Sequence, residues 1–222
     1  MEINRITDHT LLKPESTEEQ IEKILDEAKE YNFFSVCVNP VWVKKCAESL
    51  KGTDVKVCTV IGFPLGANAK EVKVFETENA IKNGANEIDM VINIGLLKSQ
   101  KYDLVKEEIQ EIAKVCHDNG ALLKVILENC LLTKEEIVKA CELSDEAGAD
   151  FVKTSTGFST SGADADDVAL MRKSVSDRVK VKASGGIRDY KKSLEMIEKG
   201  ADRLGVSAGV NIYKESKSPL WI

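Results

Sequence analysis

Lysine occurs at two positions where the local pattern calls for an apolar residue. Lys153 lies in FVKTSTGF (151–158) and Lys182 in VKVKASGGIR (179–188), each in a strand-like run that ends in a turn of small residues. A strand buried on both faces reads as a nearly continuous apolar run, and an inward charge there costs free energy. A desolvated lysine beside a second cation loses its proton easily and attacks carbonyl carbons. The pair therefore indicates Schiff-base chemistry.

Asp89 is the third candidate for this site. It stands between two apolar residues in NEIDMVI (86–92), so its carboxylate points to the opposite face of the strand from theirs. A carboxylate near the lysines favours a charged Lys182 beside a neutral Lys153, with Asp89 itself moving between protonation states as a proton shuttle. A structural salt bridge to one of the lysines is the alternative role for Asp89.

Four further residues carry polar or nucleophilic groups, and for each of them a structural role is expected or stays open. Lys124 and Glu128 share one face of a predicted strand, and we expect them to form a supporting ion pair. For His9, a structural hydrogen bond and a place on the rim of the site stay equally open. We expect Cys37 to be a buried small residue; exposure at the mouth of the site, open to alkylation by unsaturated aldehydes, is the alternative.

Glycine-containing turns after the last two predicted strands suit an anion. Backbone N–H groups in Ser184-Gly185-Gly186 and in 205–209 are uncluttered by side chains, and a short helix follows the second turn. Arg188 could add positive charge, although an exposed arginine at a helix start is the alternative. We expect a phosphate-binding site formed by Thr156, Gly157, Gly185, Gly186, Gly205 and Ser207.

The elements that position these groups alternate along the chain. A Gly-Ala pair suited to a left-handed helix C-cap separates a helical pattern from a strand pattern at Gly84, Gly120, Gly148 and Gly200. Capping boxes are expected at Ser16-x-x-Glu19 and Thr133-x-x-Glu136. Alternation of strands and amphipathic helices predicts a parallel sheet, and eight such units favour a closed (β/α)₈ barrel over an open doubly wound sheet. The predicted strands are 5–10, 33–38, 55–61, 86–92, 121–128, 150–154, 179–183 and 202–206.

Composition narrows the class of protein. A chain of 222 residues with 43% hydrophobic content suits one domain, 1–222. Its net charge of −6 argues against a nucleic-acid surface, and it has no apolar run long enough for a membrane span. Two histidines and no typical carboxylate or cysteine spacing indicate no metal site, and we expect no cofactor. The six cysteines form no C-x-x-C pair, so we expect free thiols and a cytoplasmic location.

Several segments resemble, in the right order, those of the deoxyribose-phosphate aldolase family of class I aldolases. The most specific are FVKTSTGF (151–158) and VKASGGIR (181–188) as a pair. The others are DHTLLKP (8–14), VCVNP (36–40), VIGFPLG (60–66), EIDMVINIG (87–95) and KVILE (124–128). The resemblance runs nearly end to end and implies a (β/α)₈ barrel that reversibly cleaves 2-deoxy-D-ribose 5-phosphate into acetaldehyde and D-glyceraldehyde 3-phosphate without metal.

The resemblance also implies roles. Lys153 matches the lysine that forms the Schiff base, Lys182 the second lysine that perturbs it, and Asp89 the proton-shuttling aspartate. PLWI (219–222) lacks the terminal tyrosine that some members use in proton exchange. The expected partners are a small phosphorylated sugar and aldehydes, and further copies of the chain in a homodimer or homotetramer, with Trp42 and Trp221 as candidate contacts.

Two rival functions stay open at this point. Another phosphate-binding barrel enzyme, such as an isomerase or a Schiff-base aldolase for a different sugar, would keep the glycine turns. A sugar-phosphate-binding protein without catalysis would have lost one of Asp89, Lys153 or Lys182, and all three are present.

Overall fold

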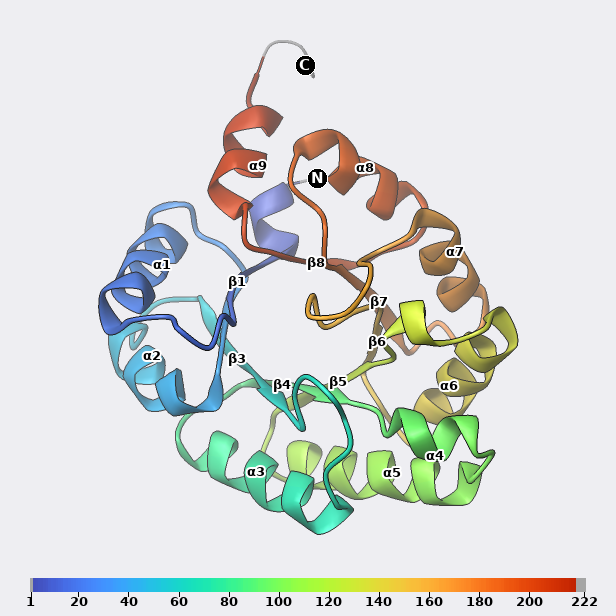
Figure 1. Ribbon diagram of the computed structural model, residues 1–222. Coiled ribbons are helices and arrows are strands. Elements are labelled where there is room, and N and C mark those ends of the chain that lie inside the picture. Colours follow the sequence, from blue (N-terminus) through green and yellow to red (C-terminus); the bar gives the residue numbers. More distant parts are fainter. Residues whose placement is uncertain (1, 219–222) are drawn as a thin grey trace.

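Eight parallel strands close into a barrel in which each strand pairs with the next along the chain and β8 pairs with β1 (Figure 1). The computed structural model describes residues 2–218. The predicted (β/α)₈ barrel is confirmed, and the open doubly wound sheet is wrong because β8 and β1 are joined. The strands are β1 (Thr7–Leu11), β2 (Ser35–Val38), β3 (Lys56–Ile61), β4 (Glu87–Val91), β5 (Leu122–Ile126), β6 (Phe151–Lys153), β7 (Lys180–Ser184) and β8 (Arg203–Val206).

Helices surround the barrel, and α9 lies beside the short N-terminal helix η1 (Figure 1). No helix within residues 2–218 is long and apolar enough to cross a membrane. The α-helices are α1 (Glu18–Glu30), α2 (Val43–Ser49), α3 (Lys70–Lys82), α4 (Ile94–Lys98), α5 (Tyr102–Asp118), α6 (Lys134–Glu146), α7 (Ala165–Lys173), α8 (Tyr190–Glu198) and α9 (Gly209–Ser216). The 3₁₀ helices are η1 (Ile3–Ile6), η2 (Pro40–Trp42) and η3 (Asn129–Leu131).

Local sequence explains where the helices begin and end. The capping box expected at Thr133 and Glu136 is present at the start of α6. At α1 the box is formed by Thr17 and Gln20, so the expectation for Ser16 was wrong by one residue. Adjacent hydroxyl residues offer the same signature, and only the extended backbone of Thr17 identifies the cap. The four predicted Gly-Ala positions all have the positive φ of a left-handed turn.

β4 has an apolar outer face and an inner face that carries two carboxylates. Ile88 and Met90 of β4 pack into the hydrophobic core between the strands and helices. Glu87 and Asp89 alternate with them, and their carboxylates are buried on the other face, inside the barrel. The interior of the barrel therefore holds charged groups that the surrounding apolar layer shields from water.

Candidate active site

Lys153, Lys182 and Asp89 meet inside the barrel. The two lysines are direct register partners on β6 and β7, so their side chains leave the sheet side by side on one face. Each Nζ lies 2.8 Å from Oδ2 of Asp89. Lys182 and Asp89 are fully buried, and Lys153 is 3% exposed. The structure thus brings together the three residues that the sequence singled out.

The second oxygen of Asp89 is also occupied. Lys124 Nζ donates to Oδ1 at 2.8 Å, and the thiol of Cys58 lies 3.2 Å from the same atom. Burial alone would raise the pKa of Asp89, but the nearby Lys124, Lys153 and Lys182 outweigh it and hold the pKa well below its ordinary value. Asp89 is therefore a carboxylate in the resting site, and its role as a proton shuttle during the reaction stays a prediction.

Lys182 is held in its charged form. Its Nζ lies 2.5 Å from Oδ2 of Asp8, in addition to its contact with Asp89. Burial opposes the charge, but the two carboxylates outweigh burial and raise the pKa of Lys182 above its ordinary value. The structure agrees here with the expectation of an ammonium group beside Lys153.

Three charged residues of this cluster were missed in the sequence. Arg203 Nη1 lies 2.7 Å from Oδ1 of Asp8 and 3.2 Å from Oε2 of Glu87, and Glu87 Oε2 lies 2.5 Å from Lys124 Nζ. All three are nearly or fully buried. The signal that identifies Asp89, a charge alternating with apolar residues in a strand, is also present at Glu87.

The predicted ion pair between Lys124 and Glu128 was wrong. Glu128 lies beyond β5 at a φ of 56°, so it no longer shares a strand face with Lys124. Its carboxylate accepts hydrogen bonds from the backbone N–H and the hydroxyl of Thr156. Glu128 thus fixes the turn that follows Lys153, whereas Lys124 belongs to the buried cluster.

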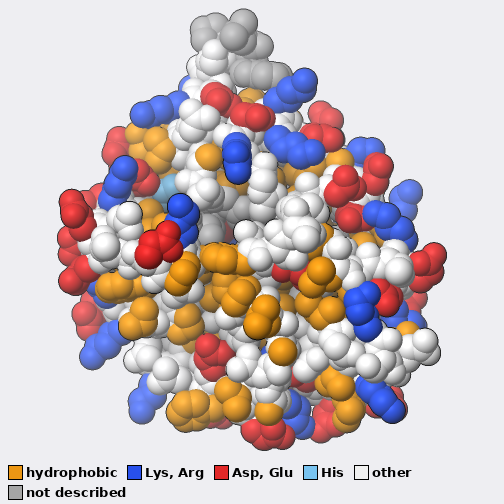
Figure 2. All heavy atoms as spheres, viewed as in Figure 1, with side chains coloured by type: hydrophobic (Ala, Val, Ile, Leu, Met, Phe, Trp, Pro, Cys, Tyr) orange, Lys and Arg blue, Asp and Glu red, His pale blue; other side chains and the backbone are white. Residues whose placement is uncertain are grey.

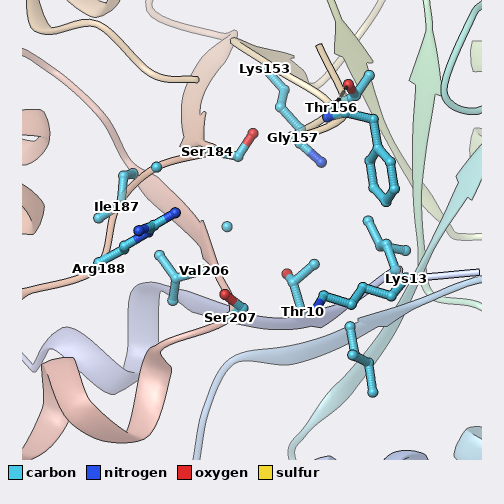
Figure 3. A pocket seen from close by; sticks show the side chains of 16 residues that line it. Thr10, Lys13, Lys153, Thr156, Gly157, Ser184, Ile187, Arg188, Val206 and Ser207 are labelled. Carbon is cyan, nitrogen blue, oxygen red and sulfur yellow. Dashed lines mark hydrogen bonds between the residues drawn. The ribbon is translucent and has the colours of Figure 1, made fainter. Parts of the chain in front are cut away.

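A cavity of about 370 Å³ opens at the carboxyl ends of β1, β6, β7 and β8 (Figure 3). Lys153 is the member of the buried cluster that borders it, and its amine points into the space. All six residues predicted for the phosphate site line this cavity. The full lining is Thr10, Leu11, Leu12, Lys13, Lys153, Thr156, Gly157, Phe158, Ser184, Gly185, Gly186, Ile187, Arg188, Gly205, Val206 and Ser207.

Two basic side chains and glycine backbone segments line this cavity. Lys13, which the sequence reading missed, and Arg188 reach in from opposite sides (Figure 3). Arg188 is exposed and lies just before α8, but it also lines the cavity. Gly185 and Gly186 have φ angles of 85° and 76°, and a side-chain carbon at Gly185 would lie 2.9 Å from Cα of Gly162. Glycine is therefore required at Gly185 by both backbone conformation and space.

His9 and Cys37 take the structural alternatives. The buried His9 ring lies with Nε2 2.6 Å from Oε2 of Glu27 and packs on Phe33, and it does not line the cavity. Burial lowers the pKa of His9 below its ordinary value, against the opposing effect of Glu27. Cys37 is fully buried in β2, with its Sγ within 4.8 Å of the thiol of Cys58 and of a carboxylate oxygen of Asp89.

Within residues 2–218, two groups of donors have the spacing for a metal ion: Cys37 with Cys58 and Asp89, and Asp8 with Cys58 and Glu87. Their carboxylate oxygens are already paired with lysine and arginine side chains. A cation placed among these groups would be repelled by the same ammonium and guanidinium charges. The donor set therefore suits a lysine-centred site better than a metal site.

Several known proteins that resemble this chain in both sequence and structure are aldolases. Residues 5–215 match the model of the DeoC/LacD family aldolases. The chain is 64% identical to the deoxyribose-phosphate aldolase of Clostridium tetani, over 98% of this chain and 100% of the relative. It is 63% identical to that of Enterococcus faecalis, over 96% of each. The solved tetrameric deoxyribose phosphate aldolase of Aeropyrum pernix superimposes with a TM-score of 0.91 at 36% identity, over 97% of this chain and 91% of that one. The chain belongs to the DeoC/LacD family of aldolases.

Proposed function

We propose that this protein reversibly cleaves 2-deoxy-D-ribose 5-phosphate into acetaldehyde and D-glyceraldehyde 3-phosphate through a Schiff base on Lys153. One observation carries the proposal: Lys153 shares one oxygen of Asp89 with Lys182 and is the lysine of the buried cluster that borders the cavity. The names of the relatives supply the substrate. The site suits an aldolase of this family, because the Schiff-base reaction needs a nucleophilic amine, a fixed charge beside it and a turn that binds an anion.

The cluster contains unequal numbers of acidic and basic groups. The cluster contains three carboxyl groups, Asp8, Glu87 and Asp89, and four basic groups, Lys124, Lys153, Lys182 and Arg203. One basic group is therefore in excess of the balance. Loss of a proton from Lys153, which alone among the four borders the cavity, leaves three cations facing three anions.

The first chemical step is imine formation. The neutral Lys153 amine attacks C1 of the open-chain sugar aldehyde to give a carbinolamine, whose hydroxyl takes up a proton and leaves as water to give an iminium ion. The positive iminium lies beside Oδ2 of Asp89, the oxygen that Lys153 Nζ contacts at 2.8 Å before reaction. The carboxylate thereby stabilises the charge that develops on the nitrogen.

Carbon–carbon cleavage follows from the iminium. The C3 hydroxyl passes its proton to water in the site, the C2–C3 bond breaks, and its electron pair moves into the iminium to give an enamine and glyceraldehyde 3-phosphate. Protonation of the enamine at C2 and hydrolysis release acetaldehyde and restore Lys153. The Lys182 ammonium, hydrogen-bonded to Asp89 at 2.8 Å, is the nearest charged donor for this proton transfer, which we route through water.

We propose that the phosphate binds at the glycine turns. Thr156, Gly157, Gly185, Gly186, Gly205 and Ser207 border the cavity, and Lys13 and Arg188 supply positive charge there. Backbone N–H groups and two cations are suited to a phosphate dianion. The substrate would then span from the glycine turns at its phosphate end to Lys153 at its aldehyde end.

Borohydride trapping tests the proposal. Protein incubated with 2-deoxyribose 5-phosphate and sodium borohydride is expected to carry one reduced adduct, on the peptide that contains Lys153. An adduct on Lys182 or Lys124 would keep the chemistry and reassign the nucleophile. Folded protein that gives no adduct would reject the Schiff base and favour another reaction in a phosphate-binding barrel. The matched control is Lys180→Ala, which removes an exposed lysine of β7 and should trap normally.

We also propose that the chain forms a homo-oligomer in the cytoplasm. Val41, Leu65 and Phe75 are 78%, 73% and 70% exposed, on η2, the β3–α3 loop and α3. Hydrophobic side chains gather across the middle and lower part of the face in Figure 2. Trp42, by contrast, packs partly buried against the core, and Trp221 lies outside the described residues. The A. pernix relative is a tetramer, and the six free cysteines suit a reducing compartment.

Sedimentation of the wild-type chain and of Phe75→Lys tests the oligomer. We expect the variant to dissociate at concentrations where the wild type stays assembled. Phe158→Lys, an exposed aromatic at the cavity instead of on α3, is the control and should assemble normally. A wild-type chain that sediments as a monomer would reject the oligomer.

A further inference from the structure

Six ion pairs form a closed ring through the barrel interior. Asp89 joins Lys182 and Lys124 through its two oxygens, at 2.8 Å each. Lys182 continues to Asp8 at 2.5 Å, and Lys124 continues to Glu87 at 2.5 Å. Arg203 completes the ring by bridging Asp8 at 2.7 Å and Glu87 at 3.2 Å. We call Asp8, Glu87, Asp89, Lys124, Lys182 and Arg203 the ion-pair ring.

Glu87 and Arg203 form the part of the ring that lies away from the chemistry. Neither lines the cavity, and they are 2% and 6% exposed. Both stand at the first position of their strands, the end opposite the mouth. The guanidinium of Arg203 lies 3.4 Å from the centre of the Phe34 ring, which fixes its plane. Glu87 and Arg203 therefore have no access to a substrate, and any effect on turnover must pass through the other members of the ring.

We propose that Glu87 and Arg203 are positioning residues that set the net charge of the ion-pair ring and thereby the pH at which Lys153 delivers a free amine. This inference rests on the Schiff-base function proposed for Lys153. The ring contains three carboxyl groups and three basic groups, so it is balanced without Lys153. Lys153 joins Asp89 from outside the ring as a fourth base.

Lys153 contacts Asp89, and the charged and titratable groups linked to Asp89 come from the seven other strands of the barrel. They are Asp8 on β1, Cys37 on β2, Cys58 on β3, Glu87 on β4, Lys124 on β5, Lys182 on β7 and Arg203 on β8. Substitution at Glu87 or Arg203 changes one charge in this set and leaves the other groups in place. A change of one charge about 10 Å away, at an effective dielectric of about 20, moves a proton equilibrium by roughly one pH unit.

Two substitutions at the same ion pair should therefore act in opposite directions. Arg203→Met removes a positive charge, leaves no basic group in excess and retains the proton on Lys153. We expect the acid limb of the pH profile of kcat/KM to shift to higher pH by roughly one unit. On that limb kcat/KM should fall roughly tenfold, and it should return to the wild-type value at alkaline pH. Glu87→Gln removes a negative charge, and we expect the same limb to move down. The Glu87→Gln/Arg203→Met double variant restores the excess of one base and should return close to the wild-type profile.

Controls separate charge from packing. Arg203→Lys keeps the charge and should keep the wild-type limb even if its rate falls. The titration of the substrate phosphate is common to all variants and cancels in the comparison. The proposal would be overturned if the acid limbs of the variants stayed at the wild-type pH while their rates fell. It would also be overturned if the acid limbs of the two single variants shifted in the same direction. If Arg203→Met does not fold, Glu87→Gln against the double variant gives the same test.

Borohydride trapping at Lys153 keeps the two proposals apart. If the wild type gives no adduct on Lys153, the proposed function has failed. If the wild type traps and turns over normally but the limbs do not move, only the role of Glu87 and Arg203 has failed. Far-UV circular dichroism of each variant shows that the comparison is between folded proteins.

Discussion

Lys73 on α3 and Glu108 on α5 form an ion pair that is shut off from water, with Nζ 2.7 Å from Oε1 and side chains 0% and 3% exposed. Lys73 also donates to the backbone carbonyl of Val91, at the end of β4, at 2.9 Å. The pair thus joins two helices to the strand that carries Asp89. Burial lowers the pKa of Lys73 and raises that of Glu108. Both directions reflect the free-energy cost of removing the two charges from water, which their mutual attraction offsets.

Removal of one partner of this pair should be costly. Lys73→Met leaves the Glu108 carboxyl buried without its cation, and we expect the free energy of unfolding to fall by about 3–5 kcal/mol. The Lys73→Met/Glu108→Leu double variant should recover most of that loss because no uncompensated charge remains. Urea unfolding at neutral pH measures both. Equal losses in the single and double variants would mean that packing, and not charge, sets the cost.

Asp89→Asn keeps the shape of the side chain and removes its charge. We expect kcat to fall by about 10²–10⁴-fold, because the iminium loses its counter-charge and the Lys182 ammonium loses the carboxylate that it contacts at 2.8 Å. Inhibition by inorganic phosphate should be unchanged, because the glycine turns are untouched. Asp54→Asn, at an exposed position before β3, is the matched control. Wild-type kcat in Asp89→Asn would remove this residue from the mechanism.

Arg188→Met tests the phosphate end of the cavity. A hydrogen bond to a charged group contributes about 1.5–3 kcal/mol, so we expect KM for the phosphorylated sugar to rise by roughly 10-fold or more. Turnover of unphosphorylated 2-deoxyribose should not change. Lys191→Met removes an exposed cation nearby on α8 that does not line the cavity, and it should leave both substrates unaffected. Equal effects on the two sugars would place the phosphate elsewhere.

The pKa of His9 predicts a pH dependence of stability. Burial outweighs Glu27 and lowers this pKa below 6.5, so below about pH 6.5 the unfolded chain binds more protons than the folded one. The stabilisation is therefore complete above that pH and is lost as the pH falls. We expect the free energy of unfolding to decrease from pH 7 to pH 5, and less so in His9→Gln. His117→Gln changes the other histidine, which is 44% exposed, and should retain the full slope.

The sequence predicted much of the fold because local and global patterns agree. Each predicted strand overlaps an observed one, and the Gly-Ala signature marks real left-handed helix ends. Lys153, Lys182 and Asp89 were found because a charge interrupts an apolar run on each of their strands. The cap of α1 was misplaced by one residue because Ser16 and Thr17 carry the same chemical signal.

The remaining residues of the site could be identified only from the closed barrel. Glu87 and Arg203 stand at the first positions of their strands, where a charged residue is usually exposed to water. Glu87 shares its strand face with Asp89, whereas the inward direction of Arg203 is evident only once β8 pairs with β1. Glu128 does not share the strand face with Lys124, because its backbone is in the left-handed region. The sequence did not indicate this conformation, because the residue is not a glycine. The segment PLWI (219–222) lies outside the described residues, so its part in proton exchange stays a prediction.

The contact between Arg203 and Asp8 has a consequence for how the protein is made. These residues stand 195 positions apart, on the last and first strands of the barrel. During synthesis the first strand emerges long before the last, so Asp8 has no guanidinium partner until almost the whole chain has left the ribosome. Long-range pairing of this kind forms late because the chain must first pay the entropy of closing so large a loop. A nascent or truncated chain that lacks β8 therefore carries Lys153 without Arg203, and the ion-pair ring is completed only when the barrel closes.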